Sequence, residues 1–171
     1  MAQDPQATLP EAEAGAVADR FKERVYATIT MIAVVVGLSV SEADATGAAL
    51  TVLTTAVGLW LAALVADLQA HRMAHRRFAT GREWRRMVYV TGPLLSCAVG
   101  PAVTIALAAL DVMSLTAALR TAAGVGIASL FAWGLLGGLR MGGGTVLALV
   151  AGLADAVIGL SVALVKATAG H

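Results

Sequence analysis

The sequence is poor in charged residues and in cysteine. Only 13% of its 171 residues are charged, whereas 58% are hydrophobic. Soluble domains carry roughly 25% charged residues, and a small fold has too much surface for its volume to hide so many apolar side chains. A soluble globular protein is therefore not expected, and lipid is the solvent that fits this composition.

The single cysteine, Cys97, lies inside an apolar run, so no disulfide can form within the chain and a small buried side chain is expected. Residues 1–20 contain acidic residues and two prolines. They lack the basic and then apolar order of a cleavable signal peptide. We predict a disordered cytoplasmic tail over residues 1–20, with a short helix near Glu11–Arg20 as the alternative.

Motifs of the common enzyme classes are missing as well. The chain has no GxSxG, HExxH, Walker or CxxC sequence, and no polar segment is long enough to form a soluble catalytic domain. We therefore predict a protein that is not an enzyme and that has no nucleic-acid partner. No resident cofactor is indicated, although a divalent metal ion as substrate remains one alternative.

Long apolar runs dominate what is present. A helical membrane span needs about 20 mostly apolar residues, and a helix satisfies its own backbone in hydrocarbon. We therefore predict an all-α integral membrane protein whose membrane domain covers residues 21–168 with five transmembrane helices. The predicted spans cover residues 25–41, 45–66, 87–110, 112–139 and 141–165, and residues 67–86 form an arginine-rich cytoplasmic loop.

The basic residues indicate the direction of these spans. Cytoplasmic connections of membrane proteins are enriched in Lys and Arg. With a cytoplasmic N-terminus and an outside C-terminus, ten of the twelve basic residues fall on the inner side. Those ten are Arg20, Lys22, Arg24, Arg72, Arg76, Arg77, Arg82, Arg85, Arg86 and Arg140.

Small residues and prolines shape the predicted helices. Gly134 with Gly138, and Gly152 with Gly159, are spaced so that neighbouring helix backbones can approach closely. Two prolines, at positions 93 and 101, are expected to bend the third span, because proline removes a helix hydrogen bond.

Two ionisable residues lie within the predicted spans. Asp155 falls near the middle of the fifth span and Arg120 in the outer part of the fourth. A charge at a helix centre costs about 2.5–3.5 kcal/mol on insertion scales. We expect the two side chains to lie at similar depth and to pair. Three interpretations are open: the pair fixes helix register, it lines a path for a cation or proton, or it joins two subunits.

A second cluster follows the second span. Asp67, His71 and His75 recur every four residues, so they lie on one face if the helix continues into the cytoplasm. Carboxylate and imidazole groups are ligands for divalent metals. The pattern predicts either a metal site or ordinary anchors at the membrane interface.

The loop also carries arginines that would attract anionic lipid headgroups. These predicted lipid-binding residues are Arg72, Arg76, Arg77, Arg82, Arg85 and Arg86.

The layout of five spans with one sizeable loop resembles the vacuolar iron transporter family. Val65-Ala-Asp67 is similar to a segment at the end of that family's second span, and Leu130-Phe-Ala-Trp-Gly134 with Gly138-Leu-Arg140 is similar to the start of its closing hairpin. The resemblance implies a helical transporter of metal ions. Phe21-Lys-Glu-Arg-Val-Tyr-Ala-Thr28 also resembles the segment that opens bacterial TMEM175-like potassium channels.

Together these features favour a channel or transporter for a small cation in a bacterial cytoplasmic membrane. Five short helices can hardly enclose a path alone, so a homo-oligomer is expected. Asp155, Arg120 and Asp67 are the candidate path residues. The alternative is a scaffold or accessory subunit that transports nothing and binds another membrane protein or anionic lipid.

Overall fold

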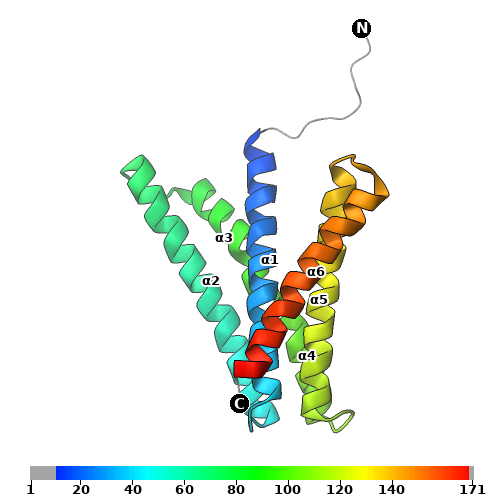
Figure 1. Ribbon diagram of the computed structural model, residues 1–171. Coiled ribbons are helices and arrows are strands. Elements are labelled where there is room, and N and C mark those ends of the chain that lie inside the picture. The colour runs from blue at the N-terminus through cyan, green and yellow to red at the C-terminus, as the bar shows by residue number, and fades with distance from the viewer. Residues whose placement is uncertain (1–10, 170–171) are drawn as a thin grey trace.

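The computed structural model describes residues 11–169, and within them every regular element is an α-helix. The predicted all-α class is therefore confirmed. Successive long helices run in alternating directions through one bundle (Figure 1). The helices are α1 (Glu11–Ser39), α2 (Ala45–His75), α3 (Gly81–Ser96), α4 (Val99–Ala109), α5 (Leu115–Arg140) and α6 (Gly144–Ala169).

Local sequence explains where several helices begin. The side chain of Asp44 accepts the Gly47 N–H at 2.9 Å at the start of α2, and Ser114 accepts the Ala117 N–H at 3.2 Å at the start of α5. Both residues are favoured helix caps, because their side chains satisfy an amide that has no partner within the helix. The long helices are thus separated by turns whose residues define their ends.

Four helical segments are long and apolar enough to cross a membrane. These segments are Ala45–His75, Gly81–Ala109, Leu115–Arg140 and Gly144–Thr168. They indicate a multi-pass membrane protein. The first predicted span, residues 25–41, is not among these four segments. Its apolar part runs only from Val25 to the end of α1 at Ser39, which is about 22 Å of helix against a hydrocarbon thickness of about 30 Å.

α1 also begins earlier than expected. It starts at Glu11, so residues 11–20 are helical and do not belong to a disordered tail. This agrees with the alternative of a helix near Glu11–Arg20, which here is continuous with the first apolar run. Residues 1–10 of the predicted tail lie outside the described residues.

α1 is the centre of the bundle, since it contacts α2, α3, α5 and α6. Its apolar face provides Met31 and Val35 to a buried cluster with α2, α4 and α5. Alanines supply much of the rest of that cluster, for example Ala48 on α2 and Ala122 on α5. Small side chains allow the helix backbones to pack closely where no hydrophobic force drives association in lipid.

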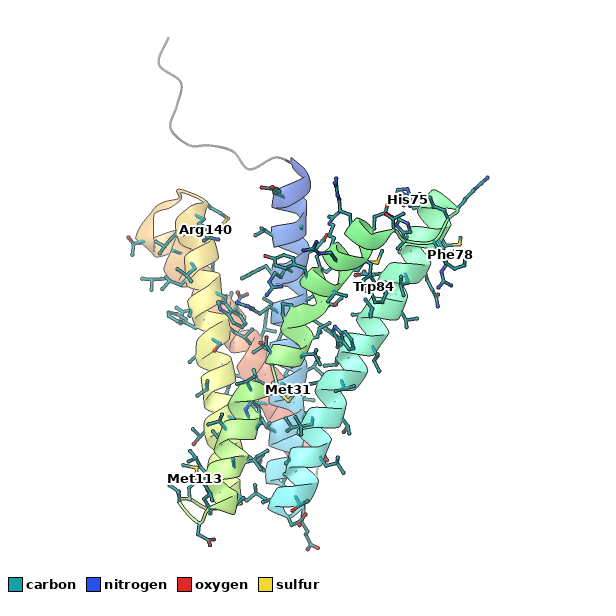
Figure 2. All side chains as sticks on the ribbon, turned by 180° about the vertical axis from the view of Figure 1, so that it is seen from behind. Met31, His75, Phe78, Trp84, Met113 and Arg140 are labelled. Atoms are coloured by element: carbon teal, nitrogen blue, oxygen red, sulfur yellow. The ribbon has the colours of Figure 1, made fainter. Side chains whose placement is uncertain are left out.

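The third predicted span is divided into α3 and α4, which meet at Cys97 and Ala98. Proline at position 93 cannot donate to the Tyr89 carbonyl one turn earlier. A guanidinium nitrogen of Arg20 on α1 donates to that carbonyl instead, and the guanidinium carbon lies 4.2 Å from the centre of the Tyr89 ring. The divided helix passes across α1, so that α3 contacts α2 and α4 contacts α5 (Figure 2).

α5 and α6 form a tightly packed hairpin. A Cβ atom built on Gly134 would lie 2.8 Å from the Ala151 carbonyl oxygen, and one on Gly152 would lie 2.8 Å from the Phe131 carbonyl oxygen. Such distances leave no room for a side chain. Gly134, Gly138 and Gly152, which the sequence singled out, therefore lie where two backbones touch, whereas Gly159 faces side chains.

Candidate functional site

A polar pocket of about 320 Å³ opens where the first half of α1, the end of α2 and the start of α3 meet. We call it the acidic pocket, because four carboxylates line it: Asp19 and Glu23 from α1, Asp67 from α2, and Glu83 from α3. It lies at the end of the bundle that carries the arginine-rich segment. Figure 2 places His75 and Phe78 at this end, together with Arg140, and Met113 at the opposite end.

The structure brings three predicted site residues to this pocket: Asp67, His71 and His75. The two imidazole rings lie 4.5 Å apart between centroids. His71 is buried, with 9% of its surface exposed, and its Nε2 atom has no hydrogen-bond partner. The same atom lies 3.6 Å from a carboxylate oxygen of Glu83.

The predicted metal site is not formed by these side chains. Within residues 11–169, no three His, Cys, Asp or Glu side chains are grouped closely enough to hold a metal ion. Two ligands four residues apart on a helix can share a metal ion, but a third one eight residues from the first is displaced from it by about 12 Å along the axis. Asp67 and His75 are two turns apart, so they do not converge on one ion.

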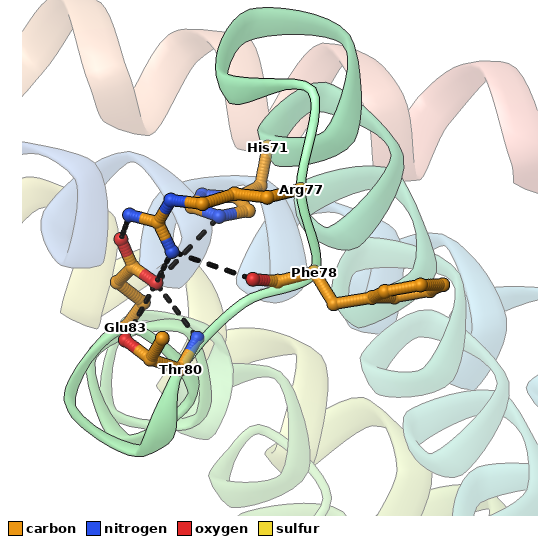
Figure 3. A network of polar contacts seen from close by, with 5 residues as sticks. All are labelled: His71, Arg77, Phe78, Thr80 and Glu83. Carbon is orange, nitrogen blue, oxygen red and sulfur yellow. Dashed lines mark hydrogen bonds and ion pairs between the residues drawn. The ribbon is translucent and has the colours of Figure 1, made fainter.

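Glu83 ties the end of α2 to the start of α3 (Figure 3). Its carboxylate accepts hydrogen bonds from the Arg77 guanidinium at 2.5 and 2.8 Å and from the Thr80 backbone N–H at 2.7 Å. The Thr80 hydroxyl donates to it as well, at 2.7 Å. These donors, Arg77 first, hold the pKa of Glu83 well below its usual range. Glu83 is therefore a structural anion whose charge is balanced locally.

The remaining carboxylates of the pocket differ in their partners. Asp19 pairs with Arg86 at 3.7 Å and Glu23 with Lys22 at 3.7 Å. Asp67 is half-buried, and no cation of the described chain lies within ion-pair distance of it. Asp67 is thus the pocket's one carboxylate without a cationic partner.

Sequence reasoning missed the contribution of α1 to this pocket. Residues up to position 20 were expected to form a polar tail, so Asp19 was not considered as a site residue. Asp19, Lys22 and Glu23 follow one another at positions i, i+3 and i+4, which places them on one helix face. That spacing is the signal that could have found them.

Asp155 lies far from this pocket in the chain, in the middle of α6. A Cβ built on Gly134 would lie 2.5 Å from its Oδ2 atom, so the carboxylate is packed against the α5 backbone where glycine leaves space. The side chain is half-buried. The ion pairs and side-chain hydrogen bonds of the described chain all involve other residues. An acid thus lies within an apolar helix without an ion-pair partner among the described residues.

Within the described chain, Arg120 and Asp155 do not form the predicted pair. Asp155 packs beside Gly134, and Arg120 lies roughly four helical turns earlier on α5, which is about 21 Å along the axis. Arg120 is exposed near the beginning of α5. The register of the hairpin therefore places the two residues at different depths.

The six arginines predicted to bind lipid are all exposed. Some of them already have contacts within the chain: Arg77 with Glu83, Arg86 with Asp19, and Arg72 with its guanidinium carbon 5.2 Å from the Phe78 ring centre. Arg76 has a left-handed backbone (φ 53°) where α2 ends. Their binding to lipid stays a prediction.

No family model, curated protein or solved structure matches this chain.

Proposed function

We propose that this protein transports a small cation across a bacterial cytoplasmic membrane, as a homo-oligomer. The cation is a proton, a monovalent ion or a divalent metal ion. In this proposal α1 crosses the membrane together with the four longer apolar segments, with the N-terminus in the cytoplasm and the C-terminus outside. Asp155 is the carboxylate at which the cation is neutralised within the membrane.

The main support for this proposal is that Asp155 has no ion-pair partner among the described residues. An ionised carboxylate at the centre of a span is costly, and such residues commonly mark ion or proton pathways. Arg120 is too distant to neutralise it. A bound proton or cation would remove the cost, and it would do so reversibly, as transport requires.

The acidic pocket supports the same proposal. It offers water-facing carboxylates at one end of the bundle, and Asp67 is the one without a cationic partner. Negative charge at the mouth of a pathway raises the local concentration of cations. In this proposal Asp67 is the first carboxylate that the cation meets on the path, and Asp155 is the deeper one.

The direction of insertion is supported by the common location of the basic segments. Arg140 and the arginine-rich segment lie at the same end of the bundle (Figure 2), which the positive-inside tendency places in the cytoplasm. Single cysteines replacing Arg82 and Lys166 in a Cys97→Ser background test this. Impermeant maleimide should label the two positions from opposite sides; labelling from the same side would disprove five crossings.

Transport itself is tested in proteoliposomes loaded with fluorescent reporters for protons, K⁺ or Mn²⁺. The wild-type protein should give a flux above that of empty vesicles, and Asp155→Asn should reduce it at least about tenfold, the equivalent of about 1.4 kcal/mol. Asp111→Asn is the matched control, because Asp111 is an exposed turn residue and asparagine tolerates its left-handed backbone (φ 57°).

Two results would count against the proposal. One is a flux in Asp155→Asn equal to that of Asp111→Asn. The other is the absence of flux for every cation in a wild-type protein that is folded and assembled. The second result would favour the alternative function, a scaffold or accessory subunit that binds a membrane protein or anionic lipid.

A further inference from the structure

A second cavity lies on the other side of α1, between α1, the α3–α4 bend and α5. Its volume is about 240 Å³. Met31 and Val35 line it from α1, Cys97 and Pro101 from the bend, and Val125 from α5. We call it the Arg24 cleft, after the residue described below.

The walls of the Arg24 cleft offer few free hydrogen-bond donors. The hydroxyl of Thr28 donates to the Arg24 carbonyl at 2.9 Å, and that of Ser129 donates to the Val125 carbonyl at 2.8 Å. Ser96 and Cys97 likewise donate to carbonyls of their own helix, at 2.9 and 2.8 Å. Because these groups are satisfied locally, the cleft presents a largely apolar surface and suits hydrocarbon better than an ion.

Arg24 is the one charged residue among those that line the cleft. Its guanidinium carbon lies 5.5 Å from the centre of the Trp133 ring. No carboxylate of the described residues lies within ion-pair distance of it, unlike Arg77 and Arg86. Arg24 immediately precedes the apolar part of α1, so the cleft has an unneutralised cation at one end and apolar walls beyond it.

The length of the cleft matches one half of a bilayer. Arg24 and Val35 both line it, and they are about 16 Å apart along α1. The hydrocarbon of one leaflet is about 15 Å thick. An anionic phospholipid has the same order of parts, with a negative phosphate at the interface and an acyl chain reaching to the middle of the membrane.

We propose that the Arg24 cleft binds an anionic phospholipid. Its phosphate pairs with the Arg24 guanidinium, and one acyl chain lies along α1 between the bend and α5. This site is separate from the exposed arginines between positions 72 and 86, and it does not depend on the transport proposal. The lipid would fill the space that the bend leaves beside α1.

Cys97 lines the cleft and is the protein's one cysteine, so it reports directly on occupancy. The experiment measures the rate at which N-ethylmaleimide modifies Cys97 in the purified full-length protein in detergent. Phosphatidylglycerol or phosphatidylcholine is added in matched amounts. Phosphatidylglycerol should slow the reaction about fivefold more than phosphatidylcholine, as one charge contact of about 1 kcal/mol predicts.

Arg24→Gln should reduce the protection by phosphatidylglycerol to that by phosphatidylcholine, and Arg24→Lys should retain most of it. Arg140→Gln is the control, because Arg140 is exposed, lies outside the cleft and is not one of the arginines predicted to bind lipid. Val125→Phe keeps Arg24 but fills the cleft, so native mass spectrometry should find one retained phosphatidylglycerol fewer. That second measurement holds even if Arg24→Gln does not fold.

Two results would overturn the proposal. The first is equal protection of Cys97 by the two lipids, which would mean that the headgroup charge is not recognised. The second is full protection by phosphatidylglycerol in Arg24→Gln.

Discussion

The acidic pocket and the α5–α6 hairpin differ in whether their carboxylates have partners. At the acidic pocket, carboxylates from three helices mostly have partners, and Glu83 alone receives four hydrogen bonds from Arg77 and Thr80. In the α5–α6 hairpin, Asp155 is packed against a glycine and has none within the described chain. The carboxylates of the acidic pocket connect α1, α2 and α3, whereas the carboxylate in the apolar hairpin has no such partner.

The largest expected effect comes from closing the space beside Asp155. Gly134→Ala would place a methyl group 2.5 Å from the Asp155 carboxylate and 2.8 Å from the Ala151 carbonyl. Overpacking of this kind costs about 1–3 kcal/mol. Unfolding in mixed micelles with increasing dodecyl sulfate measures the change in stability.

Gly137→Ala is the control for that substitution, because a Cβ there meets nothing within 4 Å. It should change the free energy of unfolding by no more than about 0.5 kcal/mol. Equal effects of the two substitutions would mean that α5 and α6 do not touch at Gly134.

A smaller effect is expected at the paired end. Glu83→Gln removes the charge that Arg77 neutralises, so thermal stability at pH 7 should fall, while Glu42→Gln, in an exposed turn, should leave it unchanged. The pKa of Glu83 is lowered by Arg77 and Thr80 from its ordinary value of 4.5. The stabilisation is therefore complete above about pH 4.5 and is lost as the pH falls towards the lower, folded-state pKa.

Melting curves at several pH values test this assignment. The wild-type protein should lose its advantage over Glu83→Gln as the pH is lowered below 4.5. An advantage that grows on acidification would show that the ionised Glu83 does not stabilise the fold.

The smallest effect on stability is expected from any interaction between Arg120 and Asp155, which the sequence suggested as a pair. Since Arg120 and Asp155 lie far apart along the hairpin, the effects of Arg120→Gln and Asp155→Asn on stability should be additive within about 0.5 kcal/mol. A double-mutant cycle measures this. A larger coupling energy would show that Arg120 and Asp155 form an ion pair, within or between subunits. It would then remove the main support for an Asp155 without a partner.

The sequence predicts the elements of this molecule better than their relative placement. Helix caps such as Asp44 and Ser114 act locally, and periodic spacing places Asp67, His71 and His75 on one face, so these features are readable from short segments. The depth of Arg120 relative to Asp155 depends on the register of α5 against α6, which backbone contact at Gly134 and Gly152 decides. No local pattern reports that register.

Other features could not be predicted from the sequence because they depend on contacts between segments that are distant in the chain. The contact of Arg20 with the Tyr89 carbonyl depends on a proline one turn after Tyr89 and on α1 lying beside α3. The position of Asp19 in the acidic pocket depends on α1 beginning at Glu11, well before its apolar run starts at Val25. Polar composition predicted a tail there, whereas packing against α3 accounts for a helix.

The transport proposal requires that Asp155 is a free carboxyl group within the membrane and that the cation binds to it on its way across. Dicyclohexylcarbodiimide, an apolar reagent for protonated carboxyl groups, tests both parts in the same proteoliposomes. Modification is expected at Asp155, mapped by mass spectrometry, with loss of flux in proportion to the modified fraction. An Asp155 that stays unmodified, or a flux that persists after complete modification, would contradict it.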